Sequence, residues 1–213
     1  MEGTEPAIEE AALVAALCAG EESSFRDVVL RYHAALVRLV RASVGSTAAA
    51  EEVATNTWRQ VICDIEAFDG RSPLKVWIFG IALHQARERG AGQRRIAVPP
   101  DRDGDLAAPA VDPDRFVPDG RRWAGHWCAP PVAWTDSPAQ RLIGQAAVAA
   151  VMSAIDELPT CPREVLTLRD VEGWTAAEVW ALLGISEADQ CALLHTGRSR
   201  VRARLEDHFG GNR

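Results

Sequence analysis

Residues 158–186 read LPTCPREVLTLRDVEGWTAAEVWALLGIS, and this stretch decides the fold of the C-terminal part of the chain. Thr175 and Glu178 stand three apart and predict a capping box, in which each side chain bonds the other residue's free backbone N–H group. The short helix that they open is expected to end at Gly184, and a long final helix is expected over 187–208. Two helices joined by a three-residue turn that contains glycine predict a helix-turn-helix.

The N-terminal part also carries helix signals. Apolar residues at helical spacing predict a helix near 7–19, a second one that Ser23 or Ser24 caps and Gly45 ends, and a third that reaches about Ile65. Two more helices, near 138–158 and 162–171, are expected ahead of the capping box. The sequence shows no strand-like alternation, so it predicts an all-α protein.

A further helix is expected after the turn FDGRS at 68–72. Ser72 is predicted to cap it, with Pro73 at the first helical position, which proline prefers. Apolar side chains then repeat at i, i+3, i+4, i+7 and i+8, and they predict one inward-facing stripe: Leu74, Trp77, Ile78, Ile81 and Ala82.

Prolines mark the predicted domain boundaries. Eight of the 12 prolines fall between 99 and 138, where no helical period survives. We therefore expect an acidic N-terminal helix in 1–24, a helical domain over 25–95, a linker over 96–137 and a second helical domain over 138–213. The linker carries three tryptophans, which a solvated linker rarely keeps: Trp123, Trp127 and Trp134.

The composition limits the cellular compartment and the class of protein to which the chain can belong. The 213 residues are 47% apolar, and no run is long enough for a membrane span. Five scattered cysteines form no C-x-x-C pair, which argues against a disulfide framework and favours a reducing cytoplasm. A net charge of −7 argues against non-specific nucleic-acid binding, although residues 67–98 hold six bases against two acids.

Candidate catalytic and metal-binding groups do not assemble into a site. Glu51 and Glu52 are adjacent, and neighbouring helical residues point about 100° apart, so they cannot share a substrate. His126 and Cys128 offer two metal ligands with nothing nearby to complete the set. The sequence therefore predicts no enzyme, no cofactor and no metal.

The final helix instead has the pattern of a DNA-binding helix. One narrow stripe can pack inward: Leu194, Gly197, Val201 and Leu205. Arginines flank this stripe on both sides at 198, 200, 202 and 204. Such a rim suits phosphate contacts, while the N-terminal residues of the helix face base edges. A rim of arginines around an ordinary core helix is the competing interpretation.

In the order of its segments, the chain resembles the extracytoplasmic-function (ECF) sigma factors of bacterial RNA polymerase, in the sigma-70 family. Residues 13–32, 50–58 (AEEVATNTW) and 68–82 (FDGRSPLKVWIFGIA) are similar to sigma region 2, and 158–186 to region 4. The linker sequences DRFVPDG and PPVAW are similar to those of one subgroup. The resemblance implies two small helical domains that bind core polymerase and direct transcription initiation.

The resemblance also implies roles for particular residues. Four of them would contact polymerase: Glu51, Glu52, Thr55 and Asn56. At the −10 element, where the loop from Asp69 to Ser72 would capture a flipped base, the expected contacts are Asp69, Arg71, Ser72, Lys75, Trp77, His84 and Arg87. At the −35 element they are Ser186, Glu187, Asp189, Gln190, His195, Arg198, Arg200 and Arg202.

The implied partners are the β and β′ subunits of core polymerase, promoter DNA and an anti-sigma factor. We expect a cytoplasmic protein that is monomeric when free and makes no membrane contact of its own. Several positions depart from the family pattern: Thr55 and Asn56 replace a Gln-Glu pair, Trp180 a small residue, and Cys191 and Thr196 basic ones. Together with Asp189, the last two predict weak or unusual −35 recognition.

Two other functions stay open on the sequence. One is a diverged sigma-like protein that binds polymerase or an anti-sigma factor without directing initiation. The other is a stand-alone helix-turn-helix regulator that binds an operator by itself.

Overall fold

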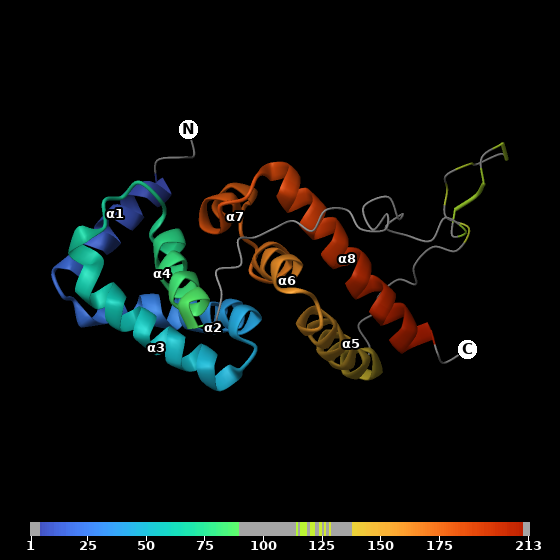
Figure 1. Ribbon diagram of the computed structural model, residues 1–213, viewed down its shortest axis with the longest axis horizontal. Coiled ribbons are helices and arrows are strands. Elements are labelled where there is room, and N and C mark those ends of the chain that lie inside the picture. The colour runs from blue at the N-terminus through green and yellow to red at the C-terminus, as the bar shows by residue number, and fades with distance from the viewer. Residues whose placement is uncertain are drawn as a thin grey trace. The chain divides into compact units, whose positions relative to one another are not determined.

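The computed structural model describes residues 5–89 and 138–210, together with 114, 116–118, 120, 121, 124, 126 and 128 of the linker. In these residues the regular elements are the helices α1 to α8 with a 3-10 turn and a π-helical turn, as the all-α prediction requires (Figure 1). The tryptophans at 123, 127 and 134, and their predicted roles, lie outside the described residues.

The chain forms two compact units that do not follow its order. The first unit combines Met1–Ala97 with Thr167–Glu187, and the second combines Val98–Leu166 with Ala188–Arg213. The chain therefore passes from one unit to the other within the predicted C-terminal domain. The predicted domain boundaries themselves stay a prediction.

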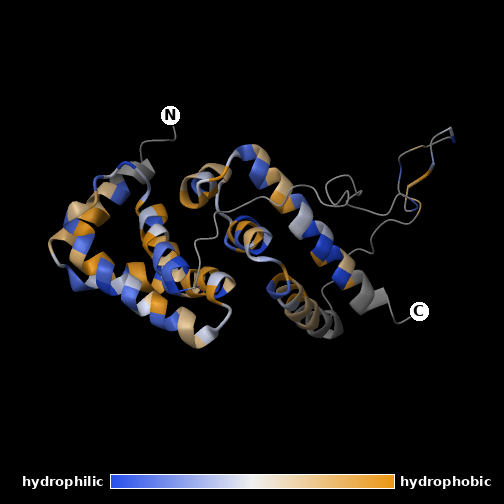
Figure 2. Cartoon of the chain, viewed as in Figure 1, coloured by the Kyte–Doolittle hydropathy of each residue, from blue (hydrophilic) through white to orange (hydrophobic). Residues whose placement is uncertain are grey.

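Three helices form the core of the first unit: α2 (Glu22–Val44), α3 (Thr47–Asp64) and α4 (Leu74–Arg89). Their apolar side chains face one another, and Figure 2 shows polar residues on the outer sides of α2 and α3. Fully buried members include Leu36, Leu39, Val40, Val53, Val61, Ile78, Phe79 and Leu83. Helix α1 (Glu5–Cys18) packs on α2 and on the 3-10 turn Ile65–Ala67, with Leu17 buried.

Helix α4 is more deeply embedded than its sequence stripe predicts. Val76 and Phe79 lie outside the predicted stripe and are buried, whereas Trp77 and Ile81 inside it are half-buried. The predicted stripe is therefore confirmed at Leu74, Ile78 and Ala82, which are buried, but it is incomplete. The reason is that α4 packs against α2 and α3, and also against α7 (Ala176–Leu183), so that more than one of its faces is covered.

The N-terminal ends of α2 and α4 are not capped by the residues that the sequence predicts. The N-cap residue of α2 is Glu21, and the predicted caps Ser23 and Ser24 instead donate hydroxyl hydrogen bonds to the Glu21 carboxylate at 2.8 and 3.1 Å. Helix α4 begins at Leu74, whose N–H donates to the Glu10 carboxylate of α1. An acceptor 64 residues away thus serves the end that Ser72 was expected to cap.

The capping box at the start of α7 is confirmed. The Thr175 hydroxyl accepts from the Glu178 N–H at 3.3 Å, and the Glu178 carboxylate accepts from the Thr175 N–H at 2.9 Å. Gly184 ends the helix with φ of 67°, a left-handed conformation that favours glycine. Before α7, the π-helical turn Thr167–Val171 includes an N–H donated from Glu172 to the Thr167 carbonyl at 2.9 Å.

The second unit contains α5 (Pro138–Asp156), α6 (Thr160–Leu166) and nearly all of α8 (Glu187–Gly210). Ile155, Leu158 and Leu166 form a buried cluster, on which Val201 of α8 packs. The predicted inward stripe of the final helix is confirmed at Leu194 and Gly197, which are buried, and at Val201.

Candidate nucleic-acid interface

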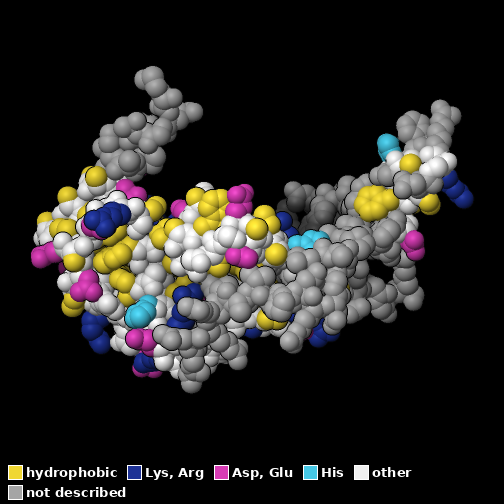
Figure 3. Space-filling model, turned by 45° about the horizontal axis from the view of Figure 1, so that its top comes forward, with side chains coloured by type: hydrophobic (Ala, Val, Ile, Leu, Met, Phe, Trp, Pro, Cys, Tyr) yellow, Lys and Arg dark blue, Asp and Glu magenta, His cyan; other side chains and the backbone are white. Residues whose placement is uncertain are grey.

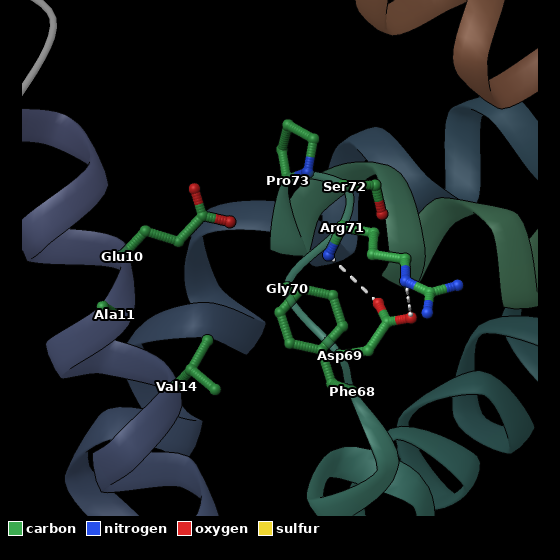
Figure 4. Close-up of a pocket in the computed structure, with 9 residues that line it drawn as sticks. All are labelled: Glu10, Ala11, Val14, Phe68, Asp69, Gly70, Arg71, Ser72 and Pro73. Atoms are coloured by element: carbon green, nitrogen blue, oxygen red, sulfur yellow. Dashed lines mark hydrogen bonds and ion pairs between the residues drawn. The ribbon is translucent and has the colours of Figure 1, made fainter.

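A cavity of about 460 Å³ lies between α1 and the loop that precedes α4. Glu10, Ala11 and Val14 line it from α1, and residues 68–73 line it from the loop. Figure 4 shows the two walls facing each other, with the Glu10 carboxylate reaching toward Pro73. Its volume is in the range of small-ligand sites, so it can admit a planar group the size of a nucleobase.

The loop is shaped by its own aspartate. Asp69 Oδ1 accepts from the Arg71 N–H at 3.0 Å, and Asp69 Oδ2 lies 3.1 Å from Arg71 Nε (Figure 4). Gly70 between them has φ of 70°, which a side chain would disfavour. The Arg71 side chain is 88% exposed, and Ser72 is half-buried. Asp69 thus fixes the turn and holds the arginine beside the cavity.

An aromatic pair joins the loop to α4. The ring centroids of Phe68 and Trp77 are 5.2 Å apart, and both residues are half-buried. Trp77 is therefore part of the packing that anchors the loop, and it keeps some exposed surface that a base could use.

Most basic side chains of α4 lie against carboxylates. Lys75 Nζ is 2.8 Å from Glu178 Oε1, His84 Nε2 is 3.4 Å from Glu88 Oε1, and Arg89 binds the Glu52 carboxylate. Arg87 is half-buried, with its Nη2 atom inaccessible. Within the described residues 67–89, the bases therefore do not form a continuous basic surface. On the face drawn in Figure 3, the described basic side chains are scattered among acidic ones.

The adjacent acids of α3 turn to different neighbours, as their helical spacing predicts. Glu51 Oε2 lies 3.3 Å from His33 Nε2 of α2, whereas Glu52 pairs with Arg89 of α4. The hydrogen bond from Arg89 lowers the pKa of Glu52, and the same bond raises the pKa of Arg89. Both acids are exposed, so they remain accessible to a basic partner.

His33 belongs to this site and no sequence motif indicated it. Its Nδ1 accepts the Trp58 indole N–H at 3.1 Å, so the buried tryptophan orients the ring that faces Glu51. The Thr55 hydroxyl donates to the Glu51 carbonyl at 2.9 Å, and Asn56 Oδ1 accepts from Arg59 at 3.3 Å. Only knowledge of the α2–α3 packing could have placed His33 here.

The residues expected to read DNA from α8 differ in accessibility. Ser186, Glu187, Arg198 and Arg200 are exposed, while Asp189, His195 and Arg202 are half-buried. Gln190 is 3% exposed, so its amide does not face solvent in this conformation. Arg204 is one of the arginines that flank the inward stripe of α8, and its Nε lies 2.7 Å from Glu157 Oε2 of α5. The hydrogen bond from Arg204 lowers the pKa of Glu157.

No group of three or more His, Cys, Asp or Glu side chains that could hold a metal ion occurs in the described part of the chain. Within the same residues, none of the helices is both long and apolar enough to cross a membrane. His126 and Cys128 are exposed.

Comparison with known families defines the class of protein to which both halves belong. Residues 28–96 match the family described as Sigma-70 region 2, and residues 149–205 match the family described as Sigma-70, region 4. The two matches stand in the order that the sequence resemblance predicted. Together the two matches cover more than half of the chain, which belongs to the sigma-70 family.

Individual relatives agree with this assignment. The ECF RNA polymerase sigma factor SigG of Mycobacterium tuberculosis is 30% identical over 74% of this chain, although the chain covers 42% of SigG. The RNA polymerase sigma factor CarQ of Myxococcus xanthus is 25% identical over 87% of this chain and 91% of CarQ. The structure of CnrH in complex with the cytosolic domain of CnrY has the same fold, with a TM-score of 0.55, 20% identity, and coverage of 96% of this chain and 99% of that one.

Proposed function

We propose that this protein binds core RNA polymerase and directs it to promoters as a non-enzymatic initiation factor. The observation that carries the proposal is the joint presence of regions 2 and 4, in that order, in one chain. A stand-alone helix-turn-helix regulator would not need region 2. Because polymerase supplies most of the general DNA affinity, a net charge of −7 is compatible with promoter binding inside the holoenzyme.

In this function Glu51 and Glu52 contact a basic surface of polymerase. Both carboxylates are exposed on α3, and their intramolecular partners are a histidine and an arginine that polymerase cations can replace. Charge pairs of this kind set the rate and specificity of association more than its final strength. Thr55 and Asn56 extend the same surface toward the C-terminal end of α3.

The −10 element is read at the cavity beside Asp69. A base flipped out of the stack would enter between the loop and α1, and its unstacking cost would be offset by contacts with the walls. Arg71 and Lys75 would neutralise nearby phosphates, while His84 and Arg87 continue along α4 toward upstream DNA. The exposed part of Trp77 offers a stacking surface.

The −35 element is read by α8, with Arg198, Arg200 and Arg202 at phosphates. Recognition here is weak, because Cys191 and Thr196 offer no positive charge and Asp189 repels phosphate. Replacing both Cys191 and Thr196 by arginine should raise the affinity of the holoenzyme for upstream promoter DNA. An unchanged binding titration would contradict this explanation.

The compartment and the partners follow from the same proposal. The protein acts in the cytoplasm, where polymerase is, and it is monomeric before it binds polymerase. The relative CnrH is in complex with the cytosolic domain of CnrY, which supports an anti-sigma partner for this chain as well.

The test is transcription with core polymerase and fragments of the host genome, followed by mapping of transcript starts. New, specific starts that depend on the protein are expected. Polymerase binding without new starts would identify a sigma-like protein that does not direct initiation, and DNA binding without polymerase would identify a stand-alone regulator. The charge-reversed variant E51K/E52K should lose the starts, while E21K/E22K, with the same change in charge on α2 and its cap, should keep them.

A further inference from the structure

The Glu10 carboxylate, on the α1 wall of the cavity, has one oxygen to spare. Its Oε1 accepts the Leu74 N–H, which ties the side chain to the start of α4. Its Oε2 has no hydrogen-bond partner among the other described residues, and Glu10 as a whole is half-buried. Because a carboxylate oxygen accepts hydrogen bonds and donates none, Oε2 can recognise only a donor that enters the cavity.

The other polar side chains of the cavity are less suited to this task. Both Asp69 oxygens already bind Arg71, one at its backbone N–H (3.0 Å) and the other at its Nε (3.1 Å). The Arg71 side chain is 88% exposed, which suits a phosphate in solvent more than an enclosed base. The Ser72 hydroxyl can both donate and accept, so it does not distinguish donors from acceptors. Glu10 is therefore the lining residue best placed to distinguish one base from another.

The rest of the lining suits a flat ring. Ala11 and Val14 from α1, and Phe68 and Pro73 from the loop, contribute apolar surface on the two walls (Figure 4). A mostly apolar site of this kind orients its ligand through a small number of polar groups. A base held between these walls would therefore be recognised through the hydrogen bond that its edge makes with Glu10.

We propose that Glu10 determines which base the cavity accepts, by selecting a base with an exocyclic amino group and rejecting thymine. The selection rests on the proposed function, in which a flipped base of the −10 element enters the cavity. Adenine, cytosine and guanine each carry an amino group that can donate to Oε2. Thymine carries none, and the carbonyl oxygens that flank its single N–H are repelled by a carboxylate.

The variant Glu10→Gln should reverse this preference. The Leu74 N–H still needs an acceptor, so the amide oxygen takes the place of Oε1 and the amide NH₂ group takes that of Oε2. The cavity then presents a donor, which a thymine oxygen can accept and which an amino group opposes. Glu9→Gln, the control, removes the same charge from the neighbouring, exposed position on α1.

The base preference is measured with core RNA polymerase on a promoter that transcript mapping has identified. Each of the four bases is placed in turn at every non-template position of the −10 element, and transcripts are counted. With wild-type protein and with E9Q, thymine at one position should reduce initiation about tenfold relative to the best base, within the usual range for one mismatch. With E10Q, this reduction should vanish or become a preference for thymine. The same preference in all three proteins would overturn the role of Glu10.

A second measurement leaves the protein unchanged and so does not depend on the folding of a variant. At each position where wild-type protein disfavours thymine, the amino group alone is deleted from the preferred base. Purine replaces adenine, 2-pyrimidinone replaces cytosine, or hypoxanthine replaces guanine. At one of these positions wild-type initiation should fall about tenfold, while E10Q should be insensitive to the deletion. Unchanged wild-type initiation at all of them would overturn the proposal.

The outcomes separate the role of Glu10 from the proposed function. A wild-type protein that directs no transcript starts with core polymerase overturns both. New starts whose base preference is altered neither by E10Q nor by deletion of the amino group retain the proposed function and overturn the selection by Glu10.

Discussion

At Gly197, α8 packs tightly against α6, and substitution of this glycine by alanine should destabilise the protein. A Cβ at Gly197 would lie 3.0 Å from Leu166 Cδ1 and 3.5 Å from the Pro162 carbonyl oxygen. Leu166 is 4% exposed and is packed in the cluster with Ile155 and Leu158, so it has little room to withdraw.

Two effects of opposite sign decide the magnitude for Gly197→Ala. Alanine in the interior of a helix is favoured over glycine by about 1 kcal/mol. Overpacking of a filled core costs about 1–3 kcal/mol. We therefore expect the free energy of unfolding to fall by about 1 kcal/mol.

The clash can be removed while Gly197→Ala is kept. Leu166→Val deletes the δ carbons and should itself cost about 1 kcal/mol, close to the value of one buried methylene. In the Leu166→Val protein the clash no longer opposes the preference of a helix for alanine over glycine. Gly197→Ala should therefore raise the free energy of unfolding of that protein by about 1 kcal/mol. The effect of the same substitution thus changes sign, which a double-mutant cycle measures directly.

The assay is urea unfolding of the full chain, monitored by the circular dichroism of its helices. The urea concentrations at the midpoint are compared between variants whose unfolding free energy depends equally steeply on urea. Ala203, exposed on the same helix, provides the control: Ala203→Gly should cost about 1 kcal/mol in both backgrounds. The reasoning is refuted if Gly197→Ala stabilises the wild-type protein, or if its effect is the same with leucine and with valine at 166.

Three further predictions concern helix ends and charge. Thr175→Ala should lower the free energy of unfolding by about 1 kcal/mol while Thr175→Ser leaves it unchanged in the same urea assay, and equal losses would contradict the role of the hydroxyl. Glu10→Ala should cost about 1 kcal/mol because the Leu74 N–H loses its acceptor, whereas Glu10→Gln, which keeps an acceptor, should not; equal thermal midpoints of the two variants would be inconsistent with this cap. Burial raises the pKa of Glu178, but the bonds from Lys75 and Thr175 outweigh burial and leave that pKa below its ordinary value. Its contribution is therefore complete above the pKa of the unfolded carboxyl and is lost as the pH falls through the folded pKa. Glu178→Gln should flatten the pH dependence of stability below about pH 5, and an unaltered profile would contradict it.

The parts of the fold that depend on local signals could be predicted from the sequence. The capping box at Thr175 and Glu178, the glycine at 184 and the inward stripe through Leu194 and Gly197 act within one or two turns of helix. Such features need only the identities and the spacing of nearby residues. The order of regions 2 and 4 could likewise be found along the chain.

The features that sequence reasoning missed depend on contacts between distant segments. Glu10 meets the N–H of a residue 64 positions later, and Arg38 pairs with a glutamate 134 positions later. The excess of bases near α4 suggested a basic patch, but Glu178 and Glu52, which face Lys75 and Arg89, come from distant segments that a charge count cannot place there. For the same reason the burial of Phe79 required knowledge that Trp174, which precedes α7, packs against it.

The π-helical turn Thr167–Val171 has an evolutionary consequence. A π turn accommodates one residue more than an α turn, so a single-codon deletion there could restore an uninterrupted α-helix. Each residue after the deletion would be rotated by about 100° about the helix axis. Glu172 and Trp174 would then point in new directions without any change in their identity. One deletion would therefore change how Glu172 packs against Arg38 and Trp174 against Phe79, without replacing any of these side chains.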